Sequence, residues 1–132
     1  MFVLDTNICI YIINNKPEKV RAKFAEISLN DIAISSITLF ELEAGARKGS
    51  KAKENLARLE QFANLIQELP FDAKAARQGG ALRQHLREQG TLIGAMDMLI
   101  AAHALSINAI VVTNNKKEFD RVPELKVENW LS

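Results

Sequence analysis

The chain has 132 residues, of which 48% are hydrophobic and 25% are charged, and its formal net charge is +1. This length is typical of one domain with a continuous core, here residues 1–132, and is too short for two. No apolar run approaches the roughly 18 residues of a membrane span, and the first residues lack a signal peptide's charged region and cleavage site, so a cytoplasmic protein is expected. The single cysteine, Cys9, excludes an internal disulfide, and the near-neutral charge does not by itself indicate a nucleic-acid binder.

The first part of the chain alternates short apolar runs with amphipathic segments. Phe2-Val3-Leu4 is an apolar run that stops at an acid, Asp5, which is typical of a strand buried on both faces. The expected elements are a strand over 2–4, a helix over 6–14, a second helix through 23–25, a strand over 32–34 and a helix from about 38 to 45.

The second part continues the alternation. Leu56, Leu59 and Phe62 recur at helical spacing, and the adjacent Gly79-Gly80 predicts a helix break or a close packing contact. The expected elements are a helix around 56–66, a strand over 68–71, a helical segment from Asp72 to 90, a loop over 90–94, a helix over 96–105, a strand over 109–113, a turn over 114–117 and a final strand over 126–128. Strands separated by helices predict an α/β fold with a mostly parallel sheet of about four or five strands and helices on both faces.

Three acids lie in otherwise apolar surroundings, each at an expected helix start: Asp5, Glu41 and Asp97. Helix starts that follow parallel strands face one crevice, so these carboxylates are expected to converge. Converging carboxylates repel one another unless a hard cation joins them. The pattern therefore predicts a Mg²⁺ or Mn²⁺ site.

Helix capping is the alternative explanation for the same acids, because a carboxylate at a helix start accepts backbone N–H bonds. Thr38 and Glu41 even match the spacing of a capping box. The histidines favour no other chemistry: His85 and His103 lack the paired spacing of zinc ligands. The serines near Glu41 also have no histidine at a spacing that would indicate a serine nucleophile.

Polar residues follow the clearest strand, at the edge where ligands are expected. Thr113 and Asn115 could hold a water, a phosphate or a metal-bound ligand there, although a role in the turn explains them equally well. Two basic groups, around Arg47 to Arg58 and around Arg77 to Arg87, are explained by solvated helix faces or, in a nuclease, by contacts with backbone phosphates.

Four motifs together resemble PIN-domain ribonucleases, and more narrowly the VapC-type toxins of bacterial toxin–antitoxin pairs. These motifs are Val3-Leu4-Asp5-Thr6-Asn7, Thr38-Leu39-Phe40-Glu41-Leu42 with Gly45, the run from Ile93 to Ala104 around Asp97, and Val112-Thr113-Asn114-Asn115 with Glu118-Phe119. The resemblance extends over essentially the whole chain.

The resemblance implies a three-layer α/β/α sandwich, dependence on Mg²⁺ or Mn²⁺, a homodimer and a structured RNA substrate such as tRNA. It also implies inhibition by a VapB-type antitoxin, whose C-terminal segment covers the acidic crevice and which alone connects the toxin to operator DNA. By the same resemblance the acidic site is Asp5, Glu41 and Asp97. The fourth position falls on Asn115 or Glu118, and Thr6, Asn7 and Thr113 are supporting residues.

The corresponding reaction is metal-assisted hydrolysis of a phosphodiester, with water as the nucleophile and products that end in 5′-phosphate and 3′-hydroxyl. Two alternatives remain at this point. One is a phosphatase that uses Asp5 as a covalent nucleophile, although Asn7 stands where such an enzyme has its second acid. The other is a catalytically silent PIN-like interaction domain, in which the three acids only cap helices.

Overall fold

Neighbouring residues of the strands point to opposite faces of the sheet and so build two separate cores. Val3 and Val111 belong to one buried cluster, while Leu4 and Val112 belong to the other. The computed structural model describes residues 1–131. No helix within this range combines the length and the apolar composition needed to cross a bilayer.

The sheet has five parallel strands in the order β3-β2-β1-β4-β5. The first strand is central and pairs with β2 and β4 on either side, with Val3 opposite Ala33 and Val111. The strands are β1 (Phe2–Leu4), β2 (Ile32–Ser35), β3 (Gln67–Leu69), β4 (Ile110–Val112) and β5 (Lys126–Glu128). The prediction of a mostly parallel α/β sheet is confirmed.

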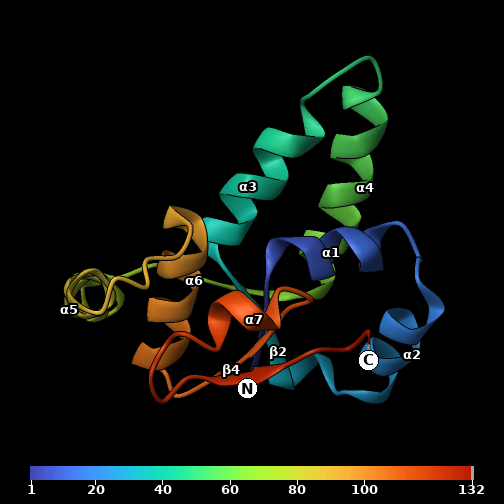
Figure 1. Ribbon diagram of the computed structural model, residues 1–132. Helices are drawn as coiled ribbons and strands as arrows, with labels where there is room; N and C mark the ends of the chain where they lie inside the picture. The colour runs from blue at the N-terminus through green and yellow to red at the C-terminus, as the bar shows by residue number, and fades with distance from the viewer. Residues whose placement is uncertain (132) are drawn as a thin grey trace.

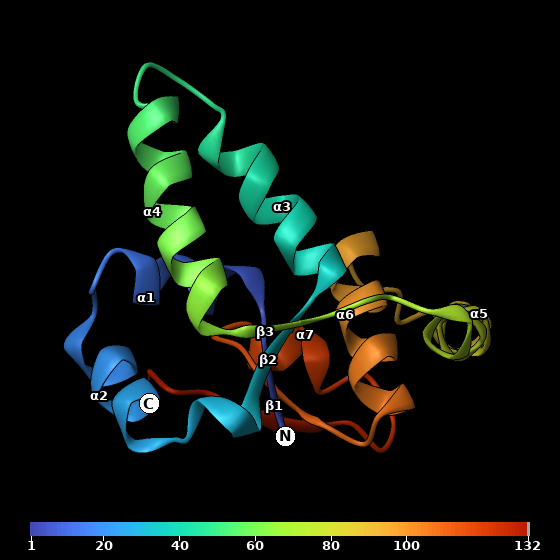
Figure 2. The same ribbon diagram turned by 180° about the vertical axis from the view of Figure 1, so that it is seen from behind.

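Helices cover both faces of this sheet (Figures 1 and 2). They are α1 (Thr6–Ile13), α2 (Glu18–Glu26), α3 (Ser36–Ala46), α4 (Ala52–Leu65), α5 (Ala73–Glu88), α6 (Ala95–Ser106) and α7 (Lys116–Phe119), with a short 3-10 turn at Leu29–Asp31. Residues of α1, α2 and α4 pack on the core around Leu4, and residues of α5, α6 and α7 pack on the core around Val3. Helices α3 and α4 lie side by side and project away from the sheet (Figure 1).

At Gly79-Gly80 the sequence predicts a break or close packing, and close packing is confirmed. Helix α5 runs unbroken through both glycines, and a Cβ on Gly79 would lie 3.5 Å from the Cβ of Ala102. The expected turn over 114–117 instead leads into α7, which begins at Lys116.

The expected start of the helix at Thr38 is also wrong. Helix α3 begins two residues earlier, because the Ser35 hydroxyl accepts the backbone N–H of Ile37 at 3.1 Å and so caps the helix. Glu41 therefore lies in the second turn, and the capping box between Thr38 and Glu41 does not form.

Candidate active site

Asp5 lies where β1 ends and α1 begins, and only 4% of its surface is exposed. One carboxylate oxygen accepts the backbone N–H of Ile8 at 3.1 Å, and the other accepts the hydroxyl of Thr113 from the end of β4. Burial raises the pKa of Asp5, these hydrogen bonds oppose that shift, and the charge of Glu41 adds to it. The carboxylate is thus fixed in place but is costly to keep ionised.

Glu41 reaches the same region from α3. Its Oε1 accepts the hydroxyl of Thr6 at 2.6 Å, and Thr6 is the first residue of α1. Since Thr6 directly follows Asp5, this bond joins the second turn of α3 to the end of β1. The position of Glu41 depends on a contact across 35 residues of sequence.

Asp97 is the third residue of α6 and is partly buried. Its pKa is raised from the usual 3.8 to about 6, first by burial and then by the charges of Glu118, Asp5 and Glu41. The four carboxyl groups, which come from three helices and one strand end, therefore lie within electrostatic reach of one another. Burial and this mutual repulsion both favour the protonated form of Asp97.

Glu118, on α7, is held more firmly than the other acids. Its Oε1 accepts the backbone N–H of Gly94 at 2.6 Å, and its Oε2 accepts the side-chain amide of Asn115 at 2.5 Å. The bond from Gly94 is the main cause that lowers the pKa of Glu118. The resemblance left Asn115 and Glu118 as alternatives, and the structure joins them as partners. The sequence did not indicate that Gly94 binds Glu118, because a hydrogen bond from a distant backbone N–H leaves no residue pattern.

The remaining candidates divide into two groups. Thr113 is fully buried, and its hydroxyl, which donates to Asp5, also accepts the backbone N–H of Asn115 at 2.9 Å. Asn7, by contrast, is exposed on α1, and its side chain makes no hydrogen bond within residues 1–131. Thr113 therefore supports the acidic residues directly, whereas Asn7 only borders them.

A histidine does lie beside a serine near this region, which spacing along the chain had not indicated. The Nδ1 atom of His103 is 2.7 Å from the hydroxyl oxygen of Ser35, across 68 residues of sequence. Both residues are almost fully buried, with exposed fractions of 3% and 1%. No substrate can reach them, so the pair serves packing.

Capping explains only part of the acidic cluster. Asp5 does cap α1, but Glu41 lies beyond the first turn of its helix. Asp97 is in the first turn of α6, yet α6 has no side-chain cap.

The oxygen atoms of the cluster, which belong to carboxylate, hydroxyl and amide groups, are the ligands that Mg²⁺ and Mn²⁺ prefer. As they stand, no three acidic, histidine or cysteine side chains in the described chain are arranged to hold a metal ion. The chemistry of the cluster fits a hard divalent cation, and its oxygens are hydrogen-bonded to neighbouring donors.

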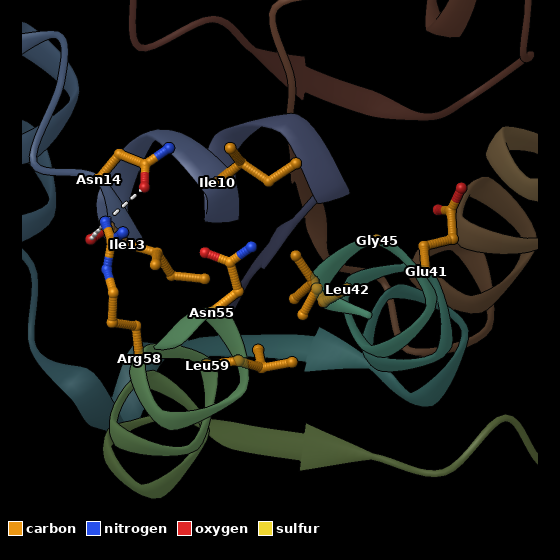
Figure 3. A pocket seen from close by; sticks show the side chains of 10 residues that line it. Ile10, Ile13, Asn14, Glu41, Leu42, Gly45, Asn55, Arg58 and Leu59 are labelled. Carbon is orange, nitrogen blue, oxygen red and sulfur yellow. Dashed lines mark hydrogen bonds between the residues drawn. The ribbon is translucent and has the colours of Figure 1, made fainter. Parts of the chain in front are cut away.

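An apolar groove of about 220 Å³ lies beside the acids, between α1, α3 and α4 (Figure 3). Ile10, Ile13, Leu42 and Leu59 supply most of its apolar side chains. Figure 3 shows Glu41 at one end of the groove and the hydrogen bond between Arg58 and Asn14, 2.6 Å long, at the other. The groove therefore connects the acidic cluster with the projecting pair α3 and α4.

Comparison with known proteins places this architecture among characterised ones. The model of the PIN domain matches residues 2–125. The chain is 46% identical over 129 residues to a tRNA(fMet)-specific endonuclease VapC of Shigella flexneri, covering 98% of this chain and 97% of the relative. It is 44% identical over 131 residues to the ribonuclease VapC2 of Rickettsia felis, with 98% of each covered. It is also similar to the crystal structure of VapBC2 from Rickettsia felis bound to a DNA fragment from their promoter, with a TM-score of 0.91, 42% identity and 98% of each chain covered.

Proposed function

The chain belongs to the PIN-domain family and, within it, to the VapC ribonucleases, and on this premise we propose that it is a Mg²⁺- or Mn²⁺-dependent endoribonuclease toxin that hydrolyses structured RNA. The proposal treats residues 1–132 as a single catalytic domain. The observation that supports it is the convergence of four acids from the end of β1 and from α3, α6 and α7: the Thr6 hydroxyl joins Glu41 to the residue after Asp5, and burial, followed by the charges of the other three acids, raises the pKa of Asp97 to about 6. Four carboxyl groups at one sheet edge, of which Asp5 is buried and the other three are half-buried, repel one another, and such an arrangement is typical of functional sites.

Each acid has a distinct role in the proposal. Asp5 and Asp97 hold the cation, and Glu41 either joins them or acts through a water as the general base. When bound, the cation lowers the pKa of a water molecule and neutralises charge on the phosphate. Thr113 and Thr6 orient the carboxylates of Asp5 and Glu41 through their hydroxyls.

Glu118 contributes in another way. Because its two oxygens are bonded to Gly94 and Asn115, it keeps the start of α6 in place and adds negative charge beside Asp97. Water attacks the phosphorus in line, and the 2′-hydroxyl takes no part in the reaction. The products should therefore carry 5′-phosphate and 3′-hydroxyl ends.

The proposed partner is a VapB-type antitoxin. Its C-terminal segment would cover the acidic crevice, and the apolar groove that ends at Glu41 is the surface best suited to continue that contact. Operator DNA would be bound through the antitoxin. The support is the similarity to VapBC2 from Rickettsia felis, whose crystal structure is bound to a DNA fragment from their promoter. We also propose a homodimer, by the same family relationship.

The substrate is proposed to be a structured RNA of the tRNA class. The support is the name of the Shigella flexneri relative, a tRNA(fMet)-specific endonuclease. The carboxylates themselves do not select an RNA, since the cation and water act on any phosphodiester.

The test is incubation of the purified protein with end-labelled RNA pools that include tRNA, with Mg²⁺, with Mn²⁺ and with a chelator. Cleavage that requires the cation and leaves 5′-phosphate ends is expected. Metal-dependent products that end in 2′,3′-cyclic phosphate would refute the water mechanism. A folded protein that cuts no RNA under any of these conditions would instead support a silent interaction domain.

A further inference from the structure

Helix α5 carries an unusual share of the positive charge. It holds Lys74, Arg77, Arg83 and Arg87 but only one acid, Glu88. Its net charge is thus +3, while the whole chain has +1, so the rest of the protein carries −2. The near-neutral total hides one strongly basic helix.

Two cations elsewhere in the chain are paired with neighbouring acids. Arg47 pairs with Glu43 at 2.6 Å, and Lys116 pairs with Asp120 at 2.8 Å. Helices α2 and α4 each mix two acids with their basic residues. Within residues 1–131, no cation of α2, α4 or α5 lies within salt-bridge distance of an acid, and α5 differs from the other two in having only one acid against four cations.

Three arginines of α5 share one exposed face. The buried side of the helix consists of Ala75, Gly79, Leu82 and Leu86, which pack toward α6. At about 100° per residue, Arg77, Arg83 and Arg87 fall within an arc of about 120° that is centred on Gly80, away from the buried side. All three arginines are exposed, and they extend over about 15 Å of helix axis.

Gly80, in the middle of this face, has no reason to be a glycine inside the fold. Nothing lies within 4 Å of the position that a Cβ would occupy there, and its backbone has an ordinary helical conformation. A glycine in a helix costs about 1 kcal/mol relative to alanine, so an exposed one without a packing role is unfavourable. A partner that approaches the helix backbone closely would account for it.

The arginine face is also connected to the candidate active site. Helix α5 ends at Glu88, and α6, which carries Asp97, begins at Ala95 after a short loop. Figures 1 and 2 show α5 packed beside α6 at the outer side of the molecule. The loop spans at most about 25 Å when fully extended, which limits how far the end of α5 can lie from the start of α6.

We propose that this face, formed by Arg77, Arg83 and Arg87 around Gly80, binds phosphates of the RNA substrate outside the bond that is cut. The inference rests on the proposed ribonuclease function. Arginine binds phosphate through two parallel N–H bonds, and three unpaired guanidinium groups in a row suit a phosphodiester backbone better than isolated ammonium groups do. The glycine allows the sugar-phosphate chain to lie close to the helix.

The main test compares two triple variants with the same change in charge. One is Arg77→Gln, Arg83→Gln and Arg87→Gln on α5, and the matched control is Lys19→Gln, Arg21→Gln and Lys23→Gln on α2. Binding to a fluorescently labelled tRNA is measured across a salt titration in proteins that also carry Asp97→Asn. Cleavage is measured in proteins that retain Asp97.

The α5 triple variant should raise the Kd at least about tenfold and should reduce the slope of log K against log salt by about 2, as expected for three lost phosphate contacts. Its KM for tRNA should rise while kcat stays within about twofold, because these side chains do not touch the reacting atoms. The control triple variant should leave Kd and KM within about twofold of the parent. Equal effects of the two triple variants, or no effect of the α5 variant, would overturn the proposal.

A second pair of variants leaves the charge unchanged. Gly80→Gln fills the centre of the arginine face, and Ala81→Gln adds the same side chain at a neighbouring exposed position outside the arc. Gly80→Gln should weaken tRNA binding several-fold while it raises helix stability, and Ala81→Gln should not weaken binding. Unchanged binding in Gly80→Gln would refute the close approach of RNA to this face.

The outcomes distinguish this inference from the ribonuclease proposal. If the unmodified protein cleaves no RNA, the proposed function fails, and the binding comparison still decides whether α5 holds RNA. If the α5 triple variant binds and cleaves tRNA normally but loses affinity for a protein partner, the arginines bind an acidic protein segment and the RNA assignment is wrong.

Discussion

The two titratable residues of α6, Asp97 and His103, meet opposite environments within one short helix. His103 is buried at 3% exposure, its Nδ1 atom lies 2.7 Å from the Ser35 hydroxyl, and the edge of the Phe71 ring contacts it at 5.5 Å between centroids. Asp97 instead shares a hydrogen bond with Glu118, which favours its protonated form, and it faces the charges of Glu118, Asp5 and Glu41. The neutral form of His103 is therefore satisfied by packing, whereas Asp97 is surrounded by like charges.

This contrast separates packing from proposed chemistry. Burial disfavours the charged form of both groups, so it raises the pKa of Asp97 and lowers the pKa of His103. For His103 the neutral form already has its hydrogen-bond partner, and nothing further is needed. The ionised form of Asp97 faces three other acids, whose charge the proposed cation would neutralise, so the acidic end of α6 is the end where we expect activity.

The largest effect should follow from Asp97→Asn. Loss of one carboxylate from a cation site removes several kcal/mol of transition-state stabilisation, so cleavage of RNA should fall by about 10³-fold or more, with the fold intact. The measurement is kcat/KM on labelled RNA at saturating Mg²⁺, together with the circular dichroism spectrum.

The matched control for that prediction is Asp31→Asn, at an exposed acid far from α6 in sequence. It should retain nearly full activity. Equal activity of both variants would mean that Asp97 is only a helix-start residue, as the capping explanation holds.

The next largest effect should be on stability, at the packed part of the same helix. Ile100 is fully buried in the core that α6 shares with α5. Ile100→Ala should lower the free energy of unfolding by about 2–5 kcal/mol, because it leaves a cavity. Urea unfolding measures this change, and Leu92→Ala, at a side chain that is 47% exposed, should change stability by less than about 0.5 kcal/mol.

The sequence was sufficient to predict the part of the fold that local patterns encode. The apolar run before Asp5 located the central strand and its acid, and the apolar stretch around Asp97 located α6 with that acid in its first turn. These are short-range signals of hydrophobicity and helix capping. The parallel order of the strands then followed from their alternation with helices.

The errors come from places where tertiary contacts decide between local options. Ser35 and Thr38 can both cap a helix, and Ser35 does so. Gly79 stays helical because α6 packs against it through Ala102. The contact between Ser35 and His103 joins residues 68 positions apart, and no local pattern reports such a pair.

A smaller effect should appear when Asp97→Asn is examined for stability in the presence of a chelator. The folded-state pKa of Asp97 is about 6 and its ordinary value is 3.8, so the folded protein binds the proton more tightly and loses stability as the pH rises through this window. Removing the charge should therefore stabilise the protein at about pH 7 by about 1 kcal/mol, after allowance for solvent screening. The gain should disappear near pH 4, and a variant less stable than the parent at pH 7 would contradict the repulsion.

The smallest effect should come from His103, and it has the opposite sign. Burial lowers the pKa of His103 below 6.5, against a smaller opposing influence of Asp72. As the pH falls below about 6.5, the unfolded chain takes up this proton before the folded protein does. The stability that neutral His103 contributes is therefore complete above that pH, and it decreases below it by at most about 1.4 kcal/mol per pH unit.

Because Asp97 titrates in the opposite direction over part of this range, the comparison should be made in the Asp97→Asn background. Adding His103→Leu should remove the acid-side loss measured by urea unfolding between about pH 7 and pH 5, whereas His85→Gln, at the exposed histidine, should leave it in place. If His103→Leu lowers stability equally at every pH, the histidine acts only through its packing and its bond to Ser35, and the contrast between the two ends of α6 reduces to the acids alone.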